Sequence, residues 1–232
     1  MAIGDVDSDS LMEIFVNSQS GGNRFLRIDF NTTTATLDLT WQSSTTIADA
    51  RYSAYLADFD YDGTPEVYTG NQIFDSQTGL ELVNGGIGNN TAWYPLGSSN
   101  FMTSVPFAAD VLNDGACASC QGLELVAGNQ VYSVEIVSYS NPGLNSMSVV
   151  REAPGLYDGA TVITDFDRDG DLDAIVTSMI FNAYNGARIY IWDLQTNTQI
   201  GNTYSPPNVA SERIGCLLYT SDAADERHGG EV

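Results

Sequence analysis

The sequence contains no lysine and a single histidine, His228, so it has few of the side chains that activate nucleophiles in enzymes. A Ser-His-Asp or Cys-His arrangement needs a histidine close to its nucleophile. His228 lies in residues 216–232, a C-terminal segment that does not follow the sequence pattern of the rest of the chain. No other histidine is available for such a site. Paired carboxylates are abundant, but metal binding explains them without acid–base chemistry. We therefore do not expect an enzyme of these classes.

Cysteine is scarce as well, with three residues in 232. Cys117 and Cys120 form a lone C-x-x-C, and no histidine is near enough to complete a tetrahedral zinc site. The sequence favours a local disulfide in an oxidising compartment, and two unbridged thiols are the alternative.

Positive charge is the third scarcity: 8 arginines face 30 acidic residues, for a net charge of −22. Such a surface repels phosphate backbones and anionic lipid head groups, which excludes nucleic acid as a natural partner. No apolar run reaches the roughly 18 residues of a membrane-spanning helix, so we expect no membrane insertion. Met1 is followed closely by three aspartates rather than by a signal peptide, and we expect the native N-terminus to lie further upstream.

The acidic residues are concentrated in four segments that resemble one another. Their first aspartates are separated by 53, 52 and 55 residues, a spacing that indicates repeated structural units. The units start near residues 3, 56, 108 and 163. A unit of this size suits a four-stranded blade of a β-propeller. We therefore predict an all-β propeller domain over residues 1–215 with about four blades.

Short apolar runs around each acidic segment predict the strands. Examples are residues 13–16, 66–68, 124–127 and 173–176 after the acidic segments, and residues 72–74, 130–134 and 188–192 further on. Turn signals follow at residues 76–79 and 196–198. The Gly-, Pro- and Asn-containing stretches 84–100 and 139–154 are predicted to be surface loops.

The acidic segments follow the pattern D-x-D-x-D-G-x-x-[DE], which brings oxygen atoms of one loop to a common point. Carboxylates at positions one, three, five and nine and a carbonyl at position seven suit Ca²⁺, whereas softer metals would need His or Cys. The predicted ligands are Asp5, Asp7, Asp9, the Leu11 carbonyl and Glu13; Asp58, Asp60, Asp62, the Thr64 carbonyl and Glu66; and Asp165, Asp167, Asp169, the Asp171 carbonyl and Asp173.

The third segment departs from this pattern. Asp110, Asp114 and Glu124 remain as candidate ligands, but Leu112 occupies position three and about six extra residues precede Glu124. We expect this site to be weaker or empty. A calcium EF-hand is the rival interpretation, but it needs helices on both sides and its last acid at position twelve, whereas here the acid at nine runs into a strand.

These motifs, together with phrases such as residues 70–75 and 125–132, make the chain resemble the FG-GAP/VCBS repeat family, the integrin-α-like β-propellers. The resemblance covers roughly residues 1–215. It implies a structural Ca²⁺ in each loop, a full propeller of usually seven blades and hence a fragment here. It also implies a secreted or surface-attached protein that serves adhesion or binds carbohydrate or protein ligands.

Two further features bear on function. Trp93 and Tyr94 lie in a long linker, where they would either stack on a sugar or plug a junction between blades. Residues 216–232 break the repeat; residues 216–226 resemble translated adapter sequence, and an ordinary disordered tail is the alternative. The expected function is a calcium-binding adhesion or ligand-binding module. The alternatives are the propeller of a secreted polysaccharide lyase or hydrolase, and a purely structural spacer.

Overall fold

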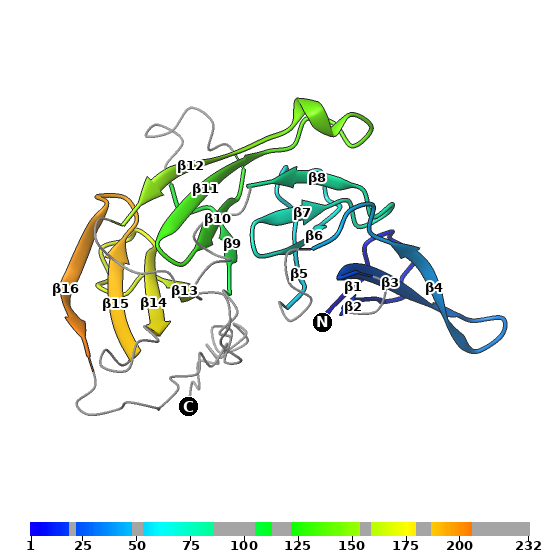
Figure 1. The fold of residues 1–232 in the computed structure, drawn as a ribbon, viewed down its shortest axis with the longest axis horizontal. Coiled ribbons are helices and arrows are strands. Elements are labelled where there is room, and N and C mark those ends of the chain that lie inside the picture. The colour runs from blue at the N-terminus through cyan, green and yellow to red at the C-terminus, as the bar shows by residue number, and fades with distance from the viewer. Residues whose placement is uncertain are drawn as a thin grey trace, which may run out of the picture.

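The computed structural model of the chain describes residues 1–18, 22–47, 53–85, 105–112, 122–153, 159–179 and 187–205. These residues form four antiparallel sheets, each of four strands in chain order. The sheets lie side by side along an arc, with the first strand of each sheet on the inner side and the last strand on the outer side (Figure 1). The single helical element among them is a short 3-10 turn, η1 (Pro142–Leu144).

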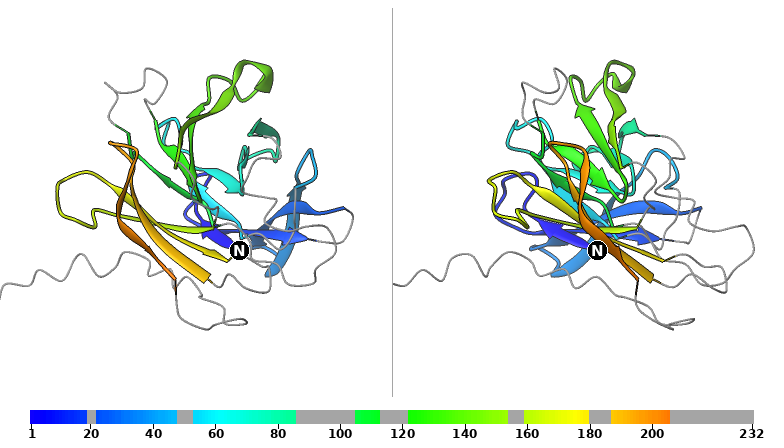
Figure 2. Two further views of the ribbon diagram at one scale, coloured as in Figure 1. Left: turned by 60° about the vertical axis from the view of Figure 1, so that its left-hand side comes forward. Right: turned by 90° about the vertical axis from the view of Figure 1, so that its left-hand side faces the viewer.

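Each sheet is an up-and-down meander. The first consists of β1 (Ala2–Gly4), β2 (Glu13–Ser18), β3 (Arg24–Asn31) and β4 (Thr36–Gln42), and the second of β5 (Tyr55–Ala57), β6 (Glu66–Thr69), β7 (Gln72–Phe74) and β8 (Glu81–Asn84). The third consists of β9 (Phe107–Ala109), β10 (Glu124–Ala127), β11 (Gln130–Glu135) and β12 (Ser146–Glu152). The fourth consists of β13 (Ala160–Thr164), β14 (Asp173–Met179), β15 (Ala187–Asp193) and β16 (Thr198–Tyr204). The turned views show how each sheet twists and how the sheets fan apart (Figure 2).

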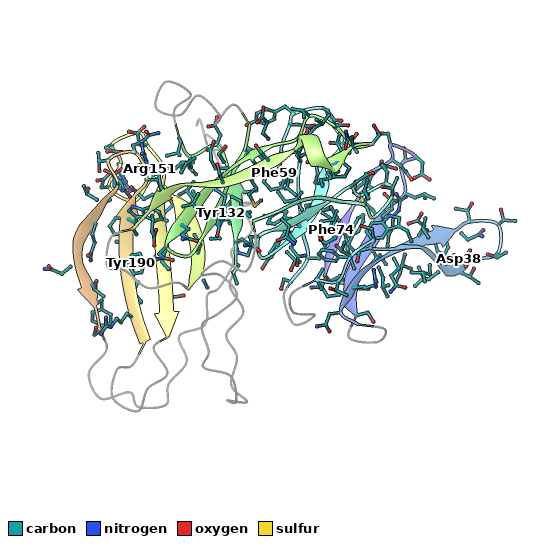
Figure 3. All side chains as sticks on the ribbon, turned by 45° about the horizontal axis from the view of Figure 1, so that its top comes forward. Asp38, Phe59, Phe74, Tyr132, Arg151 and Tyr190 are labelled. Carbon is teal, nitrogen blue, oxygen red and sulfur yellow. The ribbon has the colours of Figure 1, made fainter. Side chains whose placement is uncertain are left out.

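The hydrophobic core is divided into three clusters, one at each junction between neighbouring sheets. Phe15, Phe25, Val67 and Phe74 are among the side chains that join the first sheet to the second. The second junction contains Phe59, Tyr68, Leu125 and Tyr132, and the third contains Val126, Val131, Tyr190 and Trp192. Figure 3 shows Phe74, Tyr132 and Tyr190 spread along the arc in this way.

Burial in the middle of the arc follows from this packing. Every residue of β6, β7 and β10 is buried, because these strands have a neighbouring sheet on each face. This arrangement explains why apolar residues stand next to one another in these strands, as in Val67–Tyr68, Ile73–Phe74 and Leu125–Ala127, and do not strictly alternate with polar ones.

The sequence predicts much of this architecture correctly. The all-β class is confirmed, and the strands expected after each acidic segment are β2, β6, β10 and β14. The expectation that residues 139–154 form only a surface loop is wrong, since β12 occupies Ser146–Glu152 and pairs with β11. The described strands form an open arc, and a closed seven-bladed ring stays a prediction.

Within the described ranges, no helix has the length and apolar character needed to cross a membrane.

Candidate metal centres

Each acidic segment is the loop between the first and second strands of a sheet. The four loops therefore recur at the same place in every sheet, between β1 and β2, β5 and β6, β9 and β10, and β13 and β14. We number their positions from the first aspartate, so that position one is Asp5, Asp58, Asp110 or Asp165. The first, second and fourth loops are described completely.

The three complete loops share one backbone conformation. Positions four and six both adopt the left-handed region, with positive φ at Ser8 and Ser10, at Tyr61 and Gly63, and at Arg168 and Gly170. Ser10 stands where the other loops have glycine and still holds φ at 72°. This conformation turns the chain sharply, so that carboxylates at alternate positions point to the same side.

Aspartate side chains fix that conformation by accepting backbone hydrogen bonds. The position-one carboxylate accepts from the position-six N–H: Ser10 to Asp5 at 3.0 Å, Gly63 to Asp58 at 2.9 Å and Gly170 to Asp165 at 3.3 Å. The position-five carboxylate accepts from the position-seven N–H: Leu11 to Asp9 at 2.7 Å, Thr64 to Asp62 at 2.7 Å and Asp171 to Asp169 at 3.0 Å. The same two aspartates thus shape the turn in all three loops.

The last acid of the motif is buried at the start of the second strand in all four sheets. Its carboxylate accepts a hydrogen bond from the N–H at position two: Val6 to Glu13 at 2.8 Å, Phe59 to Glu66 at 2.9 Å, Val111 to Glu124 at 2.9 Å and Phe166 to Asp173 at 2.8 Å. The six-residue insertion in the third loop leaves this contact intact. The same hydrogen bond therefore ties each of the four loops to the second strand of its sheet.

The predicted ligands converge in three groups of carboxylates. Within each group, one oxygen per residue lies within 4.8 Å of the others. The groups are Asp5, Asp7 and Glu13; Asp58, Asp60 and Asp62; and Asp165, Asp167 and Asp173. Asp9, Glu66 and Asp169 are predicted ligands outside these groups. The carbonyls of Leu11, Thr64 and Asp171 stay predictions.

Two of these groups contain an oxygen suited to a metal ion. Oδ1 of Asp5 and Oδ1 of Asp165 are buried and accept no hydrogen bond. A buried carboxylate oxygen without a partner is unfavourable unless a cation is near it. All the side chains in these groups offer hard oxygen ligands, so the residues of the second and fourth loops fit Ca²⁺, whereas Asp7 of the first loop already pairs with Arg27.

The electrostatics of the loops agree with this fit. Burial raises the pKa of Glu66 to about 7, against a partly opposing hydrogen bond from Tyr139. Burial is also the main cause of the raised pKa of Glu13, Asp60 and Asp173, and neighbouring carboxylates add to it. Without a metal ion these loops hold negative charge that is poorly solvated, and a bound cation would stabilise it.

The acidic loops fall partly within a stretch that matches a known sequence family. Residues 5–69 match the model of a family described as an FG-GAP-like repeat. The chain contains an FG-GAP-like repeat. The matched stretch includes the first and second acidic loops, and the fourth loop shares their backbone conformation and hydrogen bonds. No curated protein matches the chain.

Solved structures extend the likeness beyond the matched repeat. The V. cholerae biofilm matrix protein Bap1 aligns with a TM-score of 0.52 and 16% identity, over 83% of this chain and 26% of its own. At this identity the likeness shows a shared fold, and the chain spans about a quarter of the length of Bap1. The exotype rhamnogalacturonan lyase YesX aligns with a TM-score of 0.37 and 15% identity, over 85% of this chain and 37% of its own. A score this low carries no argument.

The third acidic loop differs from that of the FG-GAP-like repeat. Asp110 is exposed, and Leu112 is buried in the cluster between the third and fourth sheets. Glu124 accepts a second backbone hydrogen bond, from Leu112 at 3.1 Å. In this loop the residue at position three, Leu112, therefore packs in the hydrophobic core and offers no ligand for a metal ion. Asp114, Cys117 and Cys120 lie outside the described residues, as do Trp93, Tyr94 and residues 206–232.

Two residues that the motif does not include also contact the loops. The hydroxyl of Tyr139, from the segment after β11, donates to Glu66 and, at 3.2 Å, to Asp60 of the second loop. The guanidinium of Arg27, from β3, donates to Asp7 of the first loop at 2.5 Å. Tyr139 is 73 residues away from Glu66, so nothing in the local sequence identifies it. Arg27 stands between Leu26 and Ile28 in β3, and sequence reasoning did not single it out.

Proposed function

We propose that this chain is an extracellular calcium-binding module in which Ca²⁺ stabilises the acidic loops of a propeller-like array, and that the array serves adhesion or ligand binding. The second and fourth loops carry the calcium proposal. The observation that best supports it is the carboxylate group of the fourth loop, where Oδ1 of Asp165 is buried without a hydrogen bond.

In the second loop, Asp58, Asp60 and Asp62 would hold the ion, with the Thr64 carbonyl completing the shell. In the fourth loop, Asp165, Asp167 and Asp173 would hold it, with Asp169 and the Asp171 carbonyl. The ion supplies concentrated positive charge that relieves repulsion within each group. The loop hydrogen bonds leave several carboxylate oxygens available, and the mixed set of ligands suits the flexible coordination of Ca²⁺ better than the strict octahedron of Mg²⁺.

Calcium in these loops would act on stability. Each loop joins an inner strand to a second strand that packs on a neighbouring sheet. Binding energy available only to the folded loop adds to the free energy of unfolding. Such weak sites are filled where calcium is millimolar, which is the extracellular condition.

The adhesion proposal rests on weaker support. Bap1, which shares the fold, is described as a biofilm matrix protein, and such proteins work outside the cell. The surplus of acidic residues favours a neutral ligand, a carbohydrate or another protein, over a polyanion. A glycan array with the complete protein tests this part, and enzymatic turnover of a bound glycan would favour a lyase or hydrolase instead.

A shallow cleft of about 540 Å³ offers a place for such a ligand. It lies where the first three sheets meet, and Gln42, Asp75, Leu80 and Tyr139 are among the residues that line it. A tyrosine with nearby amide and carboxylate groups is a combination that binds sugars. We expect Leu80→Arg to abolish glycan binding without changing the response to calcium. Unchanged binding by this variant would place the ligand elsewhere.

Thermal unfolding with and without calcium tests the metal proposal. EDTA should lower the melting temperature by several degrees, and added Ca²⁺ should restore it. Asp165→Asn should remove much of this response. Asp38→Asn is the matched control, because this substitution removes the same charge from the β3–β4 hairpin, away from the acidic loops (Figure 3). Equal melting with EDTA and with calcium would refute the proposal.

A further inference from the structure

The first acidic loop contains a cation supplied by the protein itself. Arg27 Nη2 lies 2.5 Å from Asp7 Oδ2 and 4.0 Å from Glu13 Oε1. Asp7 and Glu13 are two of the three carboxylates that form the group in this loop. The side chain of Arg27 is only 3% exposed. A guanidinium therefore occupies the side of the loop on which the ligands converge.

Arg27 is held in this position from several directions. Its Nε donates to Asp29 at 2.7 Å, and its Nη1 lies 3.4 Å from the Ser76 carbonyl of the second sheet. Trp41, the cross-strand partner of Arg27, also donates to the Ser76 carbonyl, at 3.0 Å. A buried guanidinium with this many partners is fixed in place, unlike a surface arginine that can swing away.

The same position in the other three sheets is apolar. Arg27 pairs with Phe15, which is two residues after Glu13. The residues two after the equivalent acids are Tyr68, Val126 and Ile175, and their partners on the next strand are Ile73, Val131 and Ile191. The first sheet is thus the one described sheet with a cation at this register.

We propose that Arg27 is the resident cation of the first acidic loop and replaces a metal ion there. Arginine keeps its charge at all physiological pH values, so it cannot give way by losing a proton. Oδ1 of Asp5 is buried without a hydrogen bond, but a divalent ion there would meet the fixed positive charge of Arg27, which already faces the other two carboxylates of the group, Asp7 and Glu13. The first loop is therefore ordered without calcium, whereas the second and fourth loops depend on it. The contrast with those loops rests on the proposed function.

Hydrogen–deuterium exchange of the full chain, read peptide by peptide, tests this inference. In the wild type, we expect protection of residues 5–13 to be the same in EDTA and in calcium, while residues 58–66 and 165–173 gain protection with calcium. In EDTA, Arg27→Gln should speed exchange of residues 5–13 on the order of tenfold or more, the effect of losing a charge-assisted hydrogen bond. Arg24→Gln is the matched control, because Arg24 lies on the same strand and donates to the Ser43 carbonyl instead.

A third variant tests the replacement directly. Arg27→Ile installs the residue found at this register in the second and fourth sheets, and residues 5–13 of this variant should become protected on adding calcium.

Two results would overturn the inference. One is a gain in protection of residues 5–13 with calcium in the wild type, which stands even if a variant does not fold. The other is unchanged protection of residues 5–13 in Arg27→Gln. If calcium changes the protection of none of the loops, the proposed calcium-binding function is refuted, but the role of Arg27 is not. The comparison of Arg27→Gln with the wild type in EDTA still decides that role.

Discussion

Removing calcium should make the stability of this protein depend on pH through Glu66. Burial raises the pKa of Glu66 from 4.5 to about 7 in the folded state. The folded state therefore holds this proton more tightly than the unfolded state does. The resulting stability is complete below about pH 4.5 and is lost as the pH rises through about 7. At about 1.4 kcal/mol per pH unit, the whole effect is about 3 kcal/mol, of which about 2 kcal/mol falls between pH 5.5 and 8.

Calcium should reverse this dependence, because a nearby cation favours the ionised carboxylate. Urea unfolding in EDTA at pH 5.5 and pH 8, repeated with calcium, measures both effects. Glu66→Gln isolates the contribution of Glu66, since other acids titrate in the same range. The reasoning is refuted if, in EDTA, the wild type minus Glu66→Gln difference in stability is flat or rises between pH 5.5 and pH 8.

Three further substitutions test the packing and the loop contacts. Glu124→Ala removes the acceptor of two buried N–H groups, and we expect a loss of about 2–4 kcal/mol in urea unfolding, with or without calcium. Tyr139→Phe removes the hydroxyl that donates to Glu66 and Asp60, and should lower stability in EDTA by about 1–3 kcal/mol; an unchanged urea midpoint would contradict that contact. Trp192→Ala empties a fully buried site between the third and fourth sheets and should lower stability by about 3–5 kcal/mol, whereas a loss below about 1 kcal/mol would mean that this junction is not a packed core.

The local pattern was enough to predict the loops and the strands that follow them. Alternating aspartates, a turn residue at position six and an apolar run describe interactions within about ten residues, and the hydrogen bonds of Asp58 and Asp62 are of this kind. The same reasoning failed for β12, because the Gly- and Pro-containing turn before it obscured a strand that β11 stabilises by pairing.

Contacts between sheets could not be predicted. Whether a loop meets Arg27 or Tyr139 depends on cross-strand register and on the packing of the next sheet. Neither is encoded near the acidic residues themselves. For this reason the sequence treats the first, second and fourth loops as nearly equivalent sites, whereas their surroundings distinguish them.

Diffraction from crystals grown with calcium tests the central claim most directly. We expect anomalous density at the second and fourth acidic loops, with oxygen atoms of Asp58, Asp60, Asp165 and Asp167 at about 2.3–2.6 Å from the ions. Crystals that contain calcium and show no ion at either loop would contradict the account.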